Sequence, residues 1–246
     1  MTRYSVFLEI TDSLCMAHVL GLPGCMVRAP AQDEALRQLP EAIHDYHAWL
    51  RLHGEPAPPA QELVEIEIVG TSTGFGPFDP GDAAALLPSD REPIFPEEME
   101  RCFRLMAYAR ADLLDWVCDL SDDVLDWQPD PQSFSIRHLL RHIGNAEEWY
   151  VSRIVTPETL PPEWEHDEDI PILDFLEMER STAVARLRLL TEEERSSVFY
   201  PTRWTQHPEE PWTARKALRR FLEHEREHTA QIRSMLAQLP GKWGTF

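Results

Sequence analysis

The sequence is poor in cysteine, in positive charge and in long apolar runs, and each shortage excludes a class of protein. The four cysteines among 246 residues include no Cys-x-x-Cys pair, so neither a disulfide framework nor cysteine ligation of a metal is expected. Lysine and arginine number 23 against 43 aspartate and glutamate residues, and the formal charge of -20 argues against binding of nucleic acid or an anionic membrane. No apolar run is long enough to span a bilayer. We therefore expect a cytoplasmic globular protein with reduced cysteines.

Several catalytic signatures are also missing. The sequence shows no Gly-rich phosphate loop, no Gly-x-Ser-x-Gly elbow and no cysteine–histidine nucleophile pair. What it does contain is a pair of histidines, His224 and His228, in a long helical pattern over 213–239. Side chains four residues apart lie on the same side of a helix, so this pair can hold one metal ion. The alternative is one satisfied core histidine and one surface histidine.

Glu225 lies between these histidines, in the middle of the apolar side of the same helix. Residues 224–228 therefore also match His-Glu-x-x-His, the zincin peptidase motif, in which Glu225 would be the general base. That motif needs a third ligand, normally downstream, and 229–246 contain no His, Asp or Glu. A zinc peptidase is consequently the least favoured function.

Apolar periodicity predicts an α+β protein with two folded parts. Strand patterns and one helical pattern in the first part give the order β-β-β-α-β, over 3–10, 14–20, 25–29, 32–53 and 63–69. A stretch rich in proline and glycine, 71–96, is interpreted as a linker. Four amphipathic helices follow, over 97–119, 135–155, 172–190 and 213–239. We expect domains at 1–70 and 97–246, the second an antiparallel four-helix bundle.

The motifs of the second part resemble the DinB/YfiT superfamily of four-helix metal proteins. The resemblance rests on Phe-Ser-Ile-Arg-His-Leu-Leu-Arg-His-Ile at 134–143 and on Glu-His-Glu-Arg-Glu-His-Thr-Ala-Gln-Ile at 223–232. In that family one ligand histidine lies on the second helix, and two more, four residues apart, lie on the last. Carried over, the resemblance implies His142, His224 and His228 as metal ligands. His138, one turn before His142, is assigned to the second shell or the surface.

Further polar residues are expected around this site. Arg110, Glu147 and Glu225 project inward from three helices, and we expect them to neutralise one another beside the metal. The alternative is an ordinary buried ion network. Gln231 follows the second histidine motif and is assigned, with Arg110, Glu147 and His138, to the second shell or to substrate contact. Glu225 is the candidate catalytic residue.

The resemblance also implies a chemistry. Three histidine ligands suit zinc, nickel, iron or copper, and ligand type does not choose among them. Relatives of known activity include metal-dependent thiol transferases and a thiol-dependent isomerase, in which the metal binds the thiolate of a low-molecular-weight cosubstrate for attack on a small electrophile. The alternative is a non-catalytic, metal-stabilised interaction module.

The first part resembles the HicB-type antitoxin domain, a small partial RNase H-like fold. The resemblance rests on Gly-Leu-Pro-Gly-Cys at 21–25, followed by Glu-Ala-Leu at 34–36 and Glu-Ala-Ile at 41–43. Such domains bind a toxin partner or oligomerise. We expect this part to serve as a docking or homodimer surface, since an exposed sheet edge tends to be paired or covered.

Overall fold

The computed structural model describes residues 1–74, 84–165 and 170–239. These residues form a four-stranded sheet and seven α-helices, in agreement with the expected α+β class. They divide into two compact units. Among the described residues, the N-terminal unit lies within Met1–Glu92 and Tyr200–Trp212, and the helical unit lies within Pro93–Phe199 and Thr213–Phe246. No helix of the described residues combines the length and apolar character needed to cross a membrane.

The sheet of the N-terminal unit has the strand order β3-β2-β1-β4. β1 pairs antiparallel with β2 and parallel with β4, and β2 pairs antiparallel with β3. The parallel pairing of β1 and β4 requires the crossover that α1 supplies. This arrangement confirms the predicted β-β-β-α-β order, with β1 at Thr2–Ile10, β2 at Cys15–Val19, β3 at Met26–Ala29, α1 at Gln32–Leu52 and β4 at Val64–Thr73.

The two faces of the sheet are covered by different segments. α1 covers one face, where the rings of Tyr4 and His47 lie 5.7 Å apart. Glu9 projects from the opposite face because side chains alternate along a strand. There its buried carboxylate lies 2.7 Å from Nε2 of His18 and accepts a 2.6 Å hydrogen bond from the Ala85 amide. Residues after β4 are therefore part of this unit's core.

Residues 200–212 also belong to the N-terminal unit, although the expected boundaries place them within the helical domain. The buried Glu210 carboxylate accepts a 2.8 Å hydrogen bond from the Ala84 amide. The expected linker over 71–96 likewise contains ordered structure: the end of β4 and the 3-10 turn η1 at Pro88–Arg91. Its residues 75–83 lie outside the described residues. The N-terminal unit is thus assembled from segments that are far apart in the sequence.

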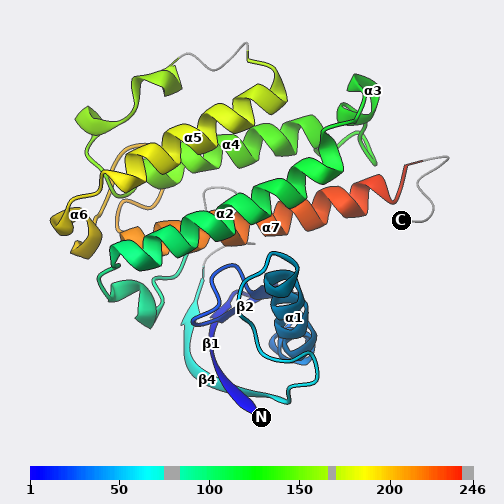
Figure 1. The fold of residues 1–246 in the computed structure, drawn as a ribbon, viewed down its shortest axis with the longest axis vertical. Coiled ribbons are helices and arrows are strands. Elements are labelled where there is room, and N and C mark those ends of the chain that lie inside the picture. The colour runs from blue at the N-terminus through cyan, green and yellow to red at the C-terminus, as the bar shows by residue number, and fades with distance from the viewer. Residues whose placement is uncertain (75–83, 166–169, 240–246) are drawn as a thin grey trace. The chain divides into compact units, whose positions relative to one another are not determined.

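Four long helices form the bundle of the helical unit (Figure 1). α2 packs against α7, and α4 packs against both α5 and α7. The helices are α2 at Pro96–Val117, α4 at Ile136–Ser152, α5 at Ile172–Arg188 and α7 at Ala214–Leu236. Two short helices, α3 at Asp122–Leu125 and α6 at Glu192–Ser196, and two 3-10 turns, η2 at Pro157–Thr159 and η3 at Pro162–Glu165, lie in the connections. The predicted four-helix bundle is confirmed.

The helix directions correct the expected antiparallel arrangement. Figure 1 shows α2 and α7 running one way, while α4 and α5 run the opposite way. Contacts between α4 and α5 agree, since Gly144 faces Phe175 and Glu147 faces Arg180 further along both helices. The physical reason is the long connection 153–171, which returns the chain to the starting end of α4 before α5 begins.

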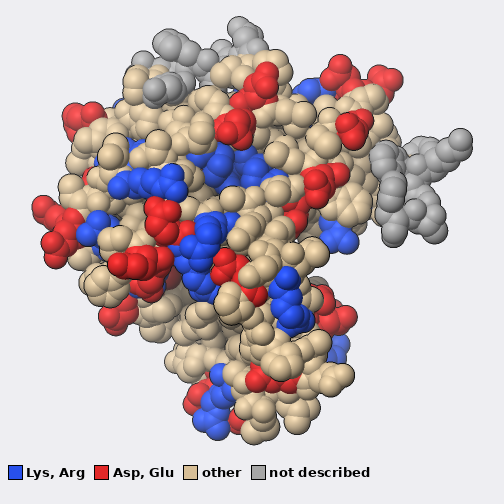
Figure 2. Space-filling view, in the orientation of Figure 1, with Lys and Arg blue, Asp and Glu red and all other residues tan. Residues whose placement is uncertain are grey.

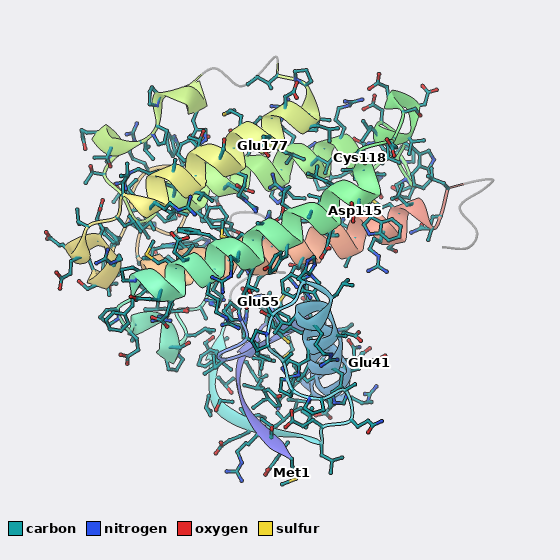
Figure 3. The ribbon with its side chains drawn as sticks, viewed as in Figure 1. Met1, Glu41, Glu55, Asp115, Cys118 and Glu177 are labelled. Carbon is teal, nitrogen blue, oxygen red and sulfur yellow. The ribbon has the colours of Figure 1, made fainter. Side chains whose placement is uncertain are left out.

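Charged residues on the outer faces of these helices are exposed. Asp115 of α2 and Glu177 of α5, labelled in Figure 3, are examples. Figure 2 shows lysine and arginine interspersed with aspartate and glutamate over the face in view. The net charge of -20 therefore does not make this face uniformly acidic. The charged residues that matter for the site are the buried ones.

Gly144 sets a close approach between α4, which carries His142, and α5. A Cβ atom at this position would lie 2.2 Å from Cε1 and 2.8 Å from Cζ of Phe175. We expect Gly144→Ala to lower the free energy of unfolding by about 1–3 kcal/mol, since overpacking outweighs the gain of up to about 1 kcal/mol in helix propensity. Chemical denaturation measures the change. Asn145→Ala, at an exposed position of the same helix, is the control. Combining Gly144→Ala with Phe175→Leu should recover stability. A Gly144→Ala variant more stable than the wild type would contradict the close packing.

Candidate metal centre

α7 presents His224 and His228 on its inner side. The helix begins at Ala214, where the Thr213 side chain accepts a 3.1 Å hydrogen bond from the Lys216 amide. Its buried apolar residues recur at helical spacing, so one side faces the bundle. His224 is buried and His228 is partly buried on that side. The helical register therefore aims both imidazoles at the same point.

α4 brings a third imidazole to that point. The helix is capped by Ser135, whose hydroxyl accepts a 3.2 Å hydrogen bond from the His138 amide. Two turns of helix then place His142 opposite α7, with its Nε2 atom 2.8 Å from Nε2 of His224. Nε2 of His228 lies 3.1 Å from Nε2 of His224. One nitrogen atom from each of the three histidines lies within 4.8 Å of the others.

The donor set fits a divalent transition metal. Two nitrogen ligands of one tetrahedral zinc ion, each bound at about 2.0–2.1 Å, lie about 3.3 Å apart. The observed separations of 2.8 and 3.1 Å are within a few tenths of an ångström of that value. His228 Nδ1–H donates a 2.8 Å hydrogen bond to Oε1 of Gln231. With the proton on Nδ1, the His228 ring turns its unprotonated Nε2 atom toward the cluster. Holding a ligand in this tautomer is the usual role of an outer-shell partner, here Gln231.

Burial keeps the imidazoles of His142 and His224 neutral. It lowers the pKa of His142 to about 4, assisted by the nearby His228 and His138. Burial also lowers the pKa of His224 well below its ordinary value, again with a contribution from His228 and His142. Neutral imidazole is the form that binds a metal. His142 and His224 are therefore in the form that binds a metal at neutral pH.

The lowered pKa of His142 predicts a pH dependence of the metal-free protein. The unfolded chain takes up a proton near pH 6.5, whereas folded His142 resists protonation to about pH 4. The part of the folding stability that is linked to His142 is therefore fully present above pH 6.5, and it should decline as the pH falls toward 4. Urea denaturation in the presence of a chelator, at pH 7 and pH 5, measures this decline. His142→Gln removes the titrating group and should make the slope shallower; an unchanged slope would show that other groups cause it.

His138 is not part of the cluster. Its side chain is exposed and stacks on the ring of Phe134, with ring centroids 4.2 Å apart and planes 2° from parallel. It lies on the outer side of α4, one turn before His142. Its assignment to the surface or second shell stays a prediction, but the structure does not bring it together with the other three histidines.

The three inward charged residues predicted from the sequence do meet, and a fourth joins them. Arg110 donates 2.5 Å hydrogen bonds to the carboxylates of Glu147 and Glu225. Arg180 of α5 donates bonds of 2.9 and 2.7 Å to Glu147 and one of 2.7 Å to Glu225. All four side chains are buried. We call Arg110, Glu147, Arg180 and Glu225 the core ion network.

The position of Glu225 bears on its predicted catalytic role. Its Oε1 atom accepts from Arg110 and its Oε2 atom accepts from Arg180, so each oxygen is held by a guanidinium. Burial alone would raise its pKa, but the charges of Arg110 and Arg180 outweigh this effect and lower it. A carboxylate held ionised between two arginines is a poor proton acceptor. This geometry disfavours the peptidase function, in which Glu225 would be the base.

Arg180 is the network residue that sequence reasoning missed. A usable signal existed, because Arg180 follows Leu176 by four residues and precedes Ala183 by three on the buried side of α5. An arginine on an apolar stripe indicates a buried partner of opposite charge.

A family model described as the DinB superfamily matches residues 105–232, which is more than half of the chain. This chain belongs to the DinB superfamily. The matched range of this DinB chain contains all three clustered histidines and the whole core ion network. Among solved structures, the DinB chain is similar to YfiT from Bacillus subtilis, described as a probable metal-dependent hydrolase with an unusual four-helix bundle topology. The two are 21% identical with a TM-score of 0.46, and the match covers 65% of this chain and 95% of that one. No curated protein matches the DinB chain.

Proposed function

We propose that this DinB-superfamily protein binds a divalent transition metal through His142, His224 and His228. The observation that carries the proposal is the convergence of three Nε2 atoms, at 2.8 and 3.1 Å, from two different helices. Zinc, nickel and iron all suit three imidazoles, so the metal is identified by measurement.

We further propose that the site acts on a low-molecular-weight thiol and a small electrophile, as a thiol transferase or a thiol-dependent isomerase. When bound, the metal would supply a Lewis acid that lowers the pKa of a coordinated thiol. The three protein ligands are neutral and leave the ion's charge uncompensated, which favours an anionic thiolate as the next ligand. Three protein ligands also leave room for a substrate, as in catalytic rather than closed structural sites.

The experiment begins with metal analysis of protein purified without chelators and without a histidine tag. Thiol consumption is then followed with a panel of low-molecular-weight thiols and an aromatic halide electrophile. We expect turnover that disappears with a chelator and returns with added zinc or nickel. His224→Ala should be inactive, while His138→Ala, matched in chemistry but outside the cluster, should retain activity.

Other outcomes of this assay identify the alternatives. Metal-dependent turnover without any thiol would assign the nucleophile to water and the protein to hydrolases. Metal binding with no turnover would favour the non-catalytic interaction module. Cleavage of peptides that is lost in Glu225→Gln would revive the peptidase function against the geometry described above.

The interaction alternative rests on the N-terminal unit. β4 is an edge strand of the sheet, and its Ile68 and Val69 side chains are exposed by 44% and 43%. Exposed apolar side chains on an edge strand favour pairing with another strand. We propose that this unit has a HicB-like, partial RNase H-like fold and that it provides a homodimer or partner surface. The mass of the protein in solution tests the second part of this proposal.

A further inference from the structure

The core ion network takes one charged side chain from each of the four long helices. Arginines come from α2 and α5, and glutamates come from α4 and α7. The two arginines are also bonded reciprocally to backbone: Arg110 donates 2.6 Å to the Leu176 carbonyl, and Arg180 donates 2.7 Å to the Met106 carbonyl. Each carbonyl belongs to the residue one turn before the other arginine. The network therefore connects all four long helices, and its two arginines make equivalent bonds to each other's helix.

The helices that supply the glutamates are the ones that supply the histidines. Glu225 follows His224 directly in α7, and Glu147 lies five residues after His142 in α4. Arg110 bonds both glutamates, and so does Arg180. Each guanidinium therefore bridges the two histidine-bearing helices. A shift of α4 along α7 would break several of these bonds and separate His142 from His224.

We propose that Arg110 and Arg180 are positioning residues, which hold α4 and α7 in register so that the three imidazoles converge before any metal binds. A guanidinium fork fixes both distance and direction to a carboxylate, which a point charge does not. In small metal domains metal binding itself drives folding. Here the core ion network fixes the positions of the two histidine-bearing helices, so the three ligands are already in place before a metal binds. The expected effect on metal affinity rests on the proposed function. The convergence of the three imidazole rings can be observed in the metal-free protein.

The competing account is that Arg180 only stabilises the fold. α5 offers a matched control, because Arg186 lies on the same helix and is equally buried, with 8% exposure for each arginine. Arg186 bonds Glu194 at 2.7 Å and the Thr159 carbonyl at 3.0 Å, and its bonds reach neither α4 nor α7 in the contacts described for it. Arg180→Lys and Arg186→Lys therefore make the same chemical change with different consequences for the site.

The test compares the full-length protein with these two variants. In the metal-free state, nuclear Overhauser contacts between the His142 ring and the His224 and His228 rings report convergence; the ring centroids lie 4.7 and 5.0 Å apart. Affinity for zinc and the visible spectrum of bound cobalt(II) report the site with metal. We expect Arg180→Lys to lose the ring contacts, to bind zinc at least about tenfold more weakly and to change the cobalt spectrum. Arg186→Lys should match the wild type in all three.

Ring contacts and zinc affinity unchanged in Arg180→Lys would overturn the inference, as would equal losses in Arg186→Lys. If Arg180→Lys does not fold, Arg180→Met with Glu147→Met removes one charge of each sign and leaves the Arg110–Glu225 pair. That variant should fold yet lose the contacts of His142, and wild-type contacts in it would also overturn the inference. Wild-type protein that shows the ring contacts but binds no metal would refute the proposed function while leaving the positioning role supported.

Discussion

Replacing His224 with alanine should reduce metal binding from about one ion per chain to almost none. Nε2 of His224 lies 2.8 Å from that of His142 and 3.1 Å from that of His228, so it is the central member of the cluster. Loss of an outer-shell partner already weakens metal affinity by about 10–100-fold, and loss of a direct ligand should exceed that. His142→Ala and His228→Ala should weaken binding similarly. Elemental analysis and competition with a chromogenic chelator measure the effect.

His138→Ala is the matched control for this result. His138 is on the same helix as His142, one turn earlier, but it is exposed and stacked on Phe134. Its loss should leave the metal content near the wild-type value. Equal losses for His138→Ala and His142→Ala would show that the ligand on α4 has been misassigned. The loss of metal binding in Gln231→Ala should lie between those of His138→Ala and His142→Ala, since Gln231 accepts a hydrogen bond from Nδ1 of His228 and is not itself a ligand.

The second large effect is expected on stability, from Glu225→Gln. The change leaves two buried arginines facing one glutamate, and breaking a buried charge pair in this way costs about 3–5 kcal/mol. For a chain of this size that corresponds to a fall of about 6–20 °C in the melting temperature. Thermal and chemical denaturation of the metal-free protein measure the change without interference from metal binding. The structure therefore favours a stabilising role for Glu225 in the bundle over the catalytic role expected from the sequence.

A compensating variant makes this prediction specific to charge. Glu225→Gln combined with Arg110→Met removes one charge of each sign and leaves Arg180 bonded to Glu147. It should recover most of the lost stability, because no uncompensated charge remains buried. Asp126→Asn, which breaks an exposed ion pair with Arg137, should change stability little. A loss of stability in Glu225→Gln as small as that in Asp126→Asn would show that the core ion network does not stabilise the fold as its geometry indicates.

The local features of the site followed from the sequence because they depend on helical spacing alone. The four-residue separation of His224 and His228 places both on one side of any helix, and apolar periodicity gave the order of the elements. The inward orientation of Arg110, Glu147 and Glu225 followed from the same periodicity. Each of these inferences needs only the geometry of a single strand or helix.

Tertiary structure alone decided which elements meet. The parallel pairing of α4 with α5 depends on where the connection 153–171 returns the chain, and no periodicity records that path. Residues 200–212 lie between two bundle helices in the sequence but join the N-terminal unit through Glu210 and the Ala84 amide. Arg180 joined the core ion network because its guanidinium reaches carboxylates on two other helices. A residue's side of a helix is set by its neighbours in sequence, whereas its partner is set by packing between distant segments.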